Sequence, residues 1–259
     1  MDFELSERAT LAEMRSALAL GHISAQELTA AHLTRIEAME PIHNAVLMIN
    51  PDAVAIAKAL DQERSTRGVR GPLHGIPILV KDNLDTGCSM PTTAGSLALA
   101  GTRASADSTV VARLRNAGAV VLGKTNLSEW ANFRSTRSSS GWSSVGGQTR
   151  NAHDPLRTPG GSSSGSGVAV ALGYCAGAIG TETDGSIVGP SSMNGVVGIK
   201  PSLGLVSRAG IVPIAASQDT AGPMTRTVRD GAIVLAAIAG ADPADSATSI
   251  VQSMPLDFE

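Results

Sequence analysis

Five apolar residues precede three polar ones in the segment Ile76-Pro77-Ile78-Leu79-Val80-Lys81-Asp82-Asn83. A short apolar run without alternation is typical of a strand that is buried on both faces, as in a parallel sheet between helices. The turn-rich stretch Gly68–Gly75 comes directly before it. We therefore expect a buried strand that carries Lys81, Asp82 and Asn83 at its carboxyl end.

Helical patterns lie on the amino-terminal side of this strand. Apolar spacing and capping residues predict helices over Leu11–Leu20, Ala25–Met39 and Asp52–Arg64. Ser24 stands directly before the second of these helices, and Glu27 follows it by three residues, which is the pattern of a capping box. The start of the chain is therefore expected to form a helical region.

Helix and strand continue to alternate after the central strand. Asp107 is expected to cap a helix that ends at Asn116. Gly118 then turns the chain into a second apolar strand, Ala119–Leu122. A further apolar helix is expected over Val168–Tyr174. This pattern predicts an α/β fold with crossover connections between the strands.

Composition and charge exclude one large class of protein. The 259 residues include 20 Lys and Arg against 23 Asp and Glu, a net charge of −3, and only 2% of them are aromatic. A balanced charge lacks the basic surface of a nucleic-acid-binding protein, and few aromatic residues provide few platforms for base stacking. We therefore expect no nucleic acid among the partners.

The cysteines, histidines and apolar runs give no sign of a metal, a cofactor or a membrane. Cys88 and Cys175 match no zinc-binding spacing, and the five histidines show no HxxxH pairing. The amino terminus lacks the features of a signal peptide. Val168–Ile179, the longest apolar stretch, is too short to cross a bilayer. We expect a soluble, cytoplasmic protein without a metal or cofactor.

The segment Arg134–Gly167 is crowded with Ser and Gly. Such a composition is common in flexible linkers. However, a Gly-rich loop held between ordered elements brings bare backbone amides close to a phosphate, a reacting carbonyl or another part of the chain. We favour the second interpretation, because an apolar helical run follows the segment at once.

Two common motifs match the sequence but not its context. Gly118–Thr125 fits GxxxxGK[ST], yet its middle residues form the predicted apolar strand and not a phosphate-binding loop. Gly161–Gly165 fits GxSxG, yet no apolar strand precedes it, and the last histidine, His153, lies upstream of these serines. A serine activated by a neutral lysine needs no histidine and is the third interpretation.

Five segments of the chain resemble the amidase signature family. The similarity runs from about Leu11 to Gly240, which is almost the whole chain. Within the family, Ser128–Phe133 and Thr181–Ser186 are most similar to the peptide amidases. The five segments are His74–Asn83, Gly123–Glu129, Gly160–Ser166, Thr181–Ile187 and Gly195–Pro201.

The resemblance implies a fold and a domain organisation. It implies an α/β domain in which a central mixed β-sheet is flanked by helices on both faces. Residues 1–259 would form this single domain, with 1–66 as a helical N-terminal region and 67–240 as the catalytic core. Family members usually continue well beyond the position of Gly240, so we expect the chain to lack the usual C-terminal portion.

The resemblance also assigns catalytic roles. Ser186 corresponds to the nucleophile and Lys81 to the base. Ser162 corresponds to the bridging serine, which follows a cis peptide bond in the family, so we expect a cis bond between Gly161 and Ser162. The apolar residues before Lys81 would lower its pKa by desolvation. Lys124 and Lys200 have no such counterpart and are expected to be structural.

Other residues are expected to contact the substrate. The backbone amides of Thr183, Asp184, Gly185 and Ser186 would donate to the oxyanion, and Gly185 would permit the close turn. Asn132 and Asp184 correspond to positions along the bound substrate in the peptide amidases. Many family members carry Gly-Gly-Ser-Ile-Arg at the nucleophile. Here the form is Asp184-Gly185-Ser186-Ile187-Val188, which adds a carboxylate and removes the arginine.

These residues favour an amidase that hydrolyses a small carboxylic amide, or a peptide C-terminal amide, to the acid and ammonia. Two alternatives stay open: an amidotransferase-type subunit that passes ammonia to a partner, and a non-catalytic binding remnant. Without the usual C-terminal portion, an apolar face of the central sheet would be exposed. We therefore expect either a homo-oligomer formed across that face or a wide, open substrate cleft.

Overall fold

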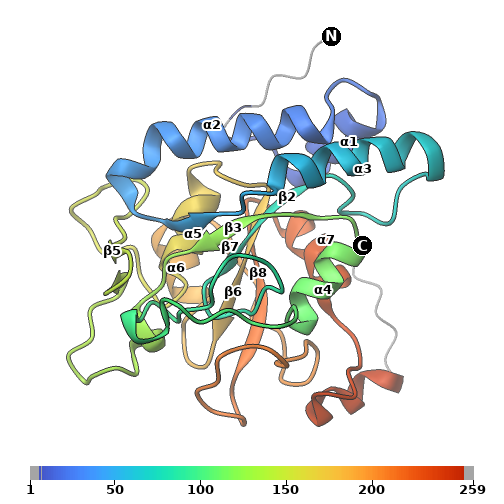
Figure 1. Ribbon diagram of the computed structural model, residues 1–259. Helices are drawn as coiled ribbons and strands as arrows, with labels where there is room; N and C mark the ends of the chain where they lie inside the picture. Colours follow the sequence, from blue (N-terminus) through green and yellow to red (C-terminus); the bar gives the residue numbers. More distant parts are fainter. Residues whose placement is uncertain (1–5, 7, 254–259) are drawn as a thin grey trace.

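A six-stranded mixed sheet forms the centre of the protein (Figure 1). The computed structural model describes residue 6 and residues 8–253. Strands β3, β2 and β6 run parallel to one another, and β1, β8 and β7 are antiparallel to their neighbours. In spatial order, the strands are β1 (Val46–Ile49), β3 (Val120–Thr125), β2 (Pro77–Lys81), β6 (Gly177–Glu182), β8 (Thr220–Thr225) and β7 (Val197–Gly198).

Helices cover both faces of this sheet, which confirms the predicted α/β class. The connections β2–α4–β3 and β3–α5–β6 cross the sheet in opposite directions, so right-handed crossovers place α4 and α5 on opposite faces. Helix α7 packs beside α4, and α2 packs against α3 along one end of the sheet. The helices are α1 (Leu11–Ala19), α2 (Ala25–His43), α3 (Ala53–Arg67), α4 (Thr109–Asn116), α5 (Ser164–Ala171), α6 (Val188–Met193) and α7 (Val228–Ile238).

Smaller elements complete the described chain. Within the Ser- and Gly-rich segment, two short strands pair to form a hairpin. No helix among the described residues is both long and apolar enough to cross a membrane. The smaller elements are β4 (Trp142–Ser143), β5 (Gly147–Gln148) and the 3₁₀ helices η1 (Leu97–Leu99), η2 (Glu129–Asn132) and η3 (Ser246–Ser253).

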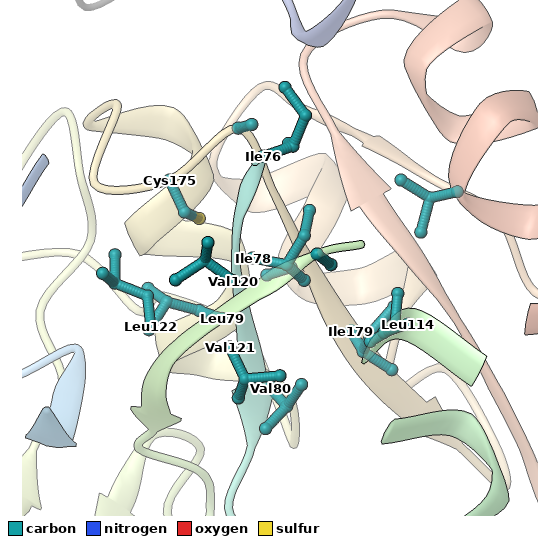
Figure 2. Packing of buried hydrophobic residues seen from close by; sticks show 14 of the residues in the cluster. Ile76, Ile78, Leu79, Val80, Leu114, Val120, Val121, Leu122, Cys175 and Ile179 are labelled. Atoms are coloured by element: carbon teal, nitrogen blue, oxygen red, sulfur yellow. The ribbon is translucent and has the colours of Figure 1, made fainter. Parts of the chain in front are cut away.

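The predicted central strand is β2, and all five of its residues are buried. Figure 2 shows its Ile78, Leu79 and Val80 packed among the apolar side chains of β3. Strand β3 extends through Thr125, three residues beyond the predicted end at Leu122, and remains buried along its whole length. This extension places a second lysine inside the sheet.

The predicted capping box of α2 is confirmed. The Ser24 hydroxyl accepts from the Glu27 N–H (3.1 Å), and the Glu27 carboxylate accepts from the Ser24 N–H (2.8 Å). The helix continues past the predicted end at Met39 to His43, with Pro41 in its last turn, and ends at Asn44 in the left-handed conformation (φ 48°). An Asn at this position satisfies the geometry of a helix end at little steric strain.

Two predictions for the other helices were wrong. The cap of α4 is Ser108 and not Asp107, because the Ser108 hydroxyl accepts from the Val111 N–H of the helix. The Asp107 carboxylate instead accepts from the Gly87 N–H (2.7 Å) and pairs with Arg115 (3.0 Å). The predicted helix Val168–Tyr174 is α5, which begins at Ser164 and ends at Ala171. The glycines and serines before the apolar run therefore form the first turn of the helix.

Replacing Ser24 by Ala tests the capping box. We expect the free energy of unfolding to fall by about 1 kcal/mol, because two backbone N–H groups of α2 lose an ordered partner arrangement. Ser65→Ala, on the exposed side of α3, is the matched control and should change stability by less than about 0.5 kcal/mol. Urea unfolding of both variants measures the difference, and equal stabilities would contradict the capping role.

Candidate active site

The structure brings Lys81 and Ser162 together at the carboxyl ends of the parallel strands. Lys81 is the last residue of β2, and its Nζ lies 2.7 Å from Ser162 Oγ. Ser162 precedes α5, and the peptide bond between Gly161 and Ser162 is cis, as predicted. Both side chains are completely buried. The proposed base and the proposed bridging serine are therefore in direct hydrogen-bond contact.

Ser186 lies in the loop between β6 and α6, beside this pair. The Ser163 N–H donates to the Ser186 carbonyl oxygen (3.1 Å), which ties the loop to the residue after Ser162. Gly185 adopts a left-handed conformation (φ 76°), so the predicted close turn is present. Asp184 is exposed, whereas Thr183 and Ser186 are buried. Their roles in oxyanion binding and attack stay predictions.

Burial changes the acidity of Lys81. Removal from water lowers the pKa of its ammonium to about 7, and the charges of Glu182 and Asp219 oppose this change. The partners of Nζ within hydrogen-bond distance are oxygen atoms of Ser162 and Thr181, not of a carboxylate. A substantial fraction of Lys81 is therefore neutral near neutral pH and can accept a proton.

A second buried lysine, Lys124, has a different environment. Its Nζ pairs with the Asp82 carboxylate (3.4 Å) and donates to the Leu84 carbonyl oxygen (2.7 Å). Burial lowers the pKa of Lys124 and raises the pKa of Asp82, and each charge opposes the change in the other. The Thr93 hydroxyl also donates to Asp82. Lys124 therefore serves as the counter-ion of a buried carboxylate.

Two carboxylates hold the loop that carries Ser186. Glu182, the last residue of β6, accepts from the Ile187 N–H (2.6 Å) and the Val188 N–H (2.9 Å). Asp219 accepts from the Thr183 hydroxyl (2.6 Å) and from two backbone N–H groups of the 213–215 loop. Both ends of the nucleophile loop are thus fixed by charge-assisted hydrogen bonds.

Asn132 lies in a strained turn at η2. Trp130, Ala131 and Asn132 all have positive φ (50°, 52° and 74°), which non-glycine residues rarely adopt. The Asn132 Oδ1 atom is buried without a hydrogen-bond partner among the described residues. The combination of strain and an unpaired amide oxygen is typical of functional positions and agrees with the expected substrate contact.

The Ser- and Gly-rich segment is ordered at the site, so the linker interpretation is wrong. A Cβ atom at Gly165 would overlap the Ala45 carbonyl oxygen, and one at Gly161 would overlap the Ser128 hydroxyl. The chain therefore needs glycine at these positions, because other backbone and side-chain atoms approach it closely. This close approach places Ser162 against Lys81.

Four residues near Lys81 were missed as single positions in the sequence. Thr181 and Asn83 make hydrogen bonds at the site, and Glu182 and Asp219 hold its loop. Thr181, Asn83 and Glu182 lie inside segments that resemble the family, but a segment match does not say which side chains touch. Thr181, Thr183 and Asp219 also line a cavity of about 230 Å³ with an apolar wall formed by residues 211–214.

A family comparison agrees with this geometry. The model of the Amidase family matches residues 27–258, most of the chain. The chain belongs to the amidase signature family. Among curated amidase relatives, a probable amidase of Arabidopsis thaliana is 47% identical over 93% of this chain and 48% of its own. The amidase-type component of the glutamyl-tRNA(Gln) amidotransferase of Acidothermus cellulolyticus is 46% identical over 96% and 48%.

Solved amidase structures show the same fold. Native peptide amidase from Stenotrophomonas maltophilia is 55% identical, with a TM-score of 0.94 over 96% of this chain and 51% of its own. The peptide amidase PAM bound to the competitive inhibitor chymostatin gives the same values. The chain thus spans about half the length of the amidases that it matches.

The described part of this amidase chain holds no group of three His, Cys, Asp or Glu side chains that could bind a metal ion. Cys88 and Cys175 are free thiols, and burial raises the pKa of Cys175 to about 12. The polar groups that meet at the amidase site are hydroxyls, amides, carboxylates and one lysine. This set of groups suits proton transfer and anion stabilisation.

Substitution by methionine should separate the two buried lysines. Lys81→Met should raise the free energy of unfolding by about 2 to 4 kcal/mol below pH 7, because both folded and unfolded wild type then hold the proton and burial penalises the folded form. From pH 7 to about 10.5 only unfolded Lys81 keeps its proton, so wild-type stability rises with pH and the gain shrinks.

Lys124→Met is the matched comparison and should have the opposite sign. It leaves the buried Asp82 carboxylate without its counter-ion, which should lower stability by about 3 to 5 kcal/mol. Urea unfolding between pH 6 and pH 9.5 measures both variants. Destabilisation by Lys81→Met at pH 6 would contradict the unpaired state of Lys81.

Proposed function

We propose that this protein is an amidase that hydrolyses carboxylic amides through an acyl-enzyme on Ser186. The observation that carries the proposal is the buried contact between Lys81 Nζ and Ser162 Oγ, with the Lys81 pKa lowered to about 7. A neutral lysine next to a hydroxyl can act as a general base without a histidine. The proposed reaction type is hydrolysis of a carbon–nitrogen bond in a linear amide.

The proposed acylation step moves one proton through Ser162. Ser186 Oγ attacks the amide carbon, its proton passes to Ser162 Oγ, and the Ser162 proton passes to Lys81 Nζ. A hydroxyl can take this role because it donates and accepts at once. The backbone N–H groups of residues 183–186 would stabilise the tetrahedral oxyanion, since Glu182 and Asp219 hold their loop.

Collapse of the intermediate returns the proton. The carbon–nitrogen bond breaks, and the Lys81 ammonium gives its proton back through Ser162 to the leaving nitrogen, which departs as ammonia or an amine. Water then attacks the Ser186 ester by the same proton route in reverse and releases the acid. Each cycle consumes one amide and one water and restores neutral Lys81.

A peptide C-terminal amide is the substrate class that we propose. The related peptide amidase PAM binds chymostatin as a competitive inhibitor, and this chain is 55% identical to it over the shared region. Asp184 is exposed next to the nucleophile, and the Asn132 amide oxygen has no partner among the described residues. Both groups can accept hydrogen bonds from the N–H groups of a peptide.

An amidotransferase-type subunit is the second candidate. The 46% identity to a component of a glutamyl-tRNA(Gln) amidotransferase favours it, whereas the Asp184-Gly185-Ser186-Ile187-Val188 form differs from the Gly-Gly-Ser-Ile-Arg form that such subunits generally carry. Affinity purification of the tagged chain distinguishes the two: stoichiometric co-purification of a tRNA-binding subunit would favour ammonia transfer.

Ser186→Ala should abolish amide hydrolysis and leave the fold unchanged. The Ser186 hydroxyl forms no hydrogen bond with another described residue, so its removal should change the free energy of unfolding by less than about 0.5 kcal/mol. A fluorophosphonate probe should label the wild type, and labelling should be lost in the variant. Ser192→Ala, exposed on α6, should keep both properties. Hydrolysis by Ser186→Ala at the wild-type rate would exclude this nucleophile.

Hydrolysis should depend on pH through Lys81. Below pH 7 the ammonium form dominates, so kcat/KM should fall about tenfold for each pH unit on the acid side. Lys81→Ala should lower the acylation rate by about 10²- to 10⁴-fold and remove this acid limb. Rates with a peptide amide from pH 5 to pH 9 test both expectations, and an unchanged acid limb in Lys81→Ala would assign the titration to another group.

A further inference from the structure

Three oxygen atoms surround Lys81 Nζ in the buried site. They are Ser162 Oγ at 2.7 Å, Thr181 Oγ1 at 2.8 Å and the Thr181 carbonyl oxygen at 3.4 Å. A neutral amine has two hydrogens and one lone pair, whereas an ammonium has three hydrogens and needs three acceptors. The surroundings of Nζ therefore match the protonated lysine, which is the form that proton transfer from Ser162 would create.

Thr181 supplies two of the three acceptors, and its own position is fixed on both sides. Its backbone N–H and carbonyl oxygen are held by the Ser163 hydroxyl (3.2 and 3.1 Å). Its hydroxyl accepts a hydrogen bond from Asn83 Nδ2 (3.0 Å), which fixes the direction in which Oγ1 points. All three residues are buried, so water does not compete for these bonds.

We propose that Thr181 is a positioning residue for the base, because its hydroxyl and carbonyl oxygens complete with Ser162 a three-acceptor cradle for the Lys81 ammonium, and Asn83 orients that hydroxyl. The inference rests on the proposed role of Lys81 as base. The cradle holds Nζ against Ser162 and stabilises the positive charge that develops as the proton leaves Ser186. Stabilisation of charge only as it forms accelerates the step without tightening substrate binding.

The cradle has a defined effect on the acidity of Lys81. Hydrogen bonds to an ammonium are stronger than those to a neutral amine, so each acceptor favours the protonated form. Removal of Thr181 Oγ1 should therefore lower the Lys81 pKa further below its wild-type value of about 7. The same change weakens the base and leaves Nζ less firmly placed, which lowers the acylation rate.

Thr181→Val removes the hydroxyl at almost constant volume, and Thr181→Ser keeps it. In Thr181→Val, kcat should fall by about 10- to 100-fold, KM should stay within about threefold, and the acid limb of the pH profile should move to lower pH. Thr181→Ser should restore most of both properties. Thr86→Val is the matched control, because Thr86 is also fully buried and its hydroxyl has no partner among the described residues.

Asn83→Leu tests the second half of the proposal. Asn83 acts through Thr181, so this variant should lower kcat by about 3- to 10-fold alone and cause no further loss in the Thr181→Val background. Additive losses in the double variant would show that Asn83 acts independently and would overturn its assigned role.

A readout independent of activity comes from the lysines themselves. The chain has four, Lys58, Lys81, Lys124 and Lys200, so NMR of protein labelled with ¹³C at lysine Cε gives a simple spectrum, and Lys81→Ala assigns the Lys81 signal. The Lys81 pKa should be lower in Thr181→Val than in wild type and restored in Thr181→Ser, while exposed Lys58 does not change. An unchanged Lys81 pKa in Thr181→Val would overturn the cradle. Absence of hydrolysis by the wild type would instead overturn the proposed function, and the titration would still decide the cradle.

Discussion

A lysine that is wholly removed from water, with no carboxylate of the described residues within hydrogen-bond distance, is the constraint on which this structure depends. An ammonium in such a place is unfavourable unless other groups accept its hydrogens, and here hydroxyl and carbonyl oxygens do so. Strand β2 holds Lys81 rigidly, since both of its neighbours in the sheet, β3 and β6, are parallel to it. Helix α5 brings Ser162 to it. The energy lost by burying this amine is supplied by the apolar core around it (Figure 2).

The pleat of the sheet explains how Lys81 stays apart from the carboxylate next to it in the sequence. Successive residues of an extended chain point to opposite faces, so Asp82 points away from the Ser162 side and meets Lys124 and Thr93. The negative charge of Asp82 is thereby matched on its own face. The two buried lysines of adjacent strands thus have separate electrostatic surroundings, one paired with a carboxylate and one surrounded by neutral acceptors.

Much of this arrangement could be predicted from the sequence, and the remainder depends on tertiary contacts. The apolar run before Lys81 and the Ser24 capping box are local signals, and both were predicted correctly. Asp107 and Ser108 are equally good caps by residue type, and only the contacts of Asp107 with Gly87 and Arg115 decide between them. The importance of Thr181 could not be predicted in the same way. Its contact with Lys81 depends on the register of β2 against β6, which no local pattern encodes.

The crowded glycines of the segment before α5 affect how the protein can change. Gly165 and Gly161 approach the Ala45 carbonyl and the Ser128 hydroxyl so closely that a methyl group would collide with them. A stretch whose simple composition suggests a spacer is therefore among the parts of the molecule least tolerant of substitution. Variation in a mutational library should accumulate instead on the outer turns of α2 and α3, where side chains face solvent. Low sequence complexity in this chain records steric crowding and not freedom.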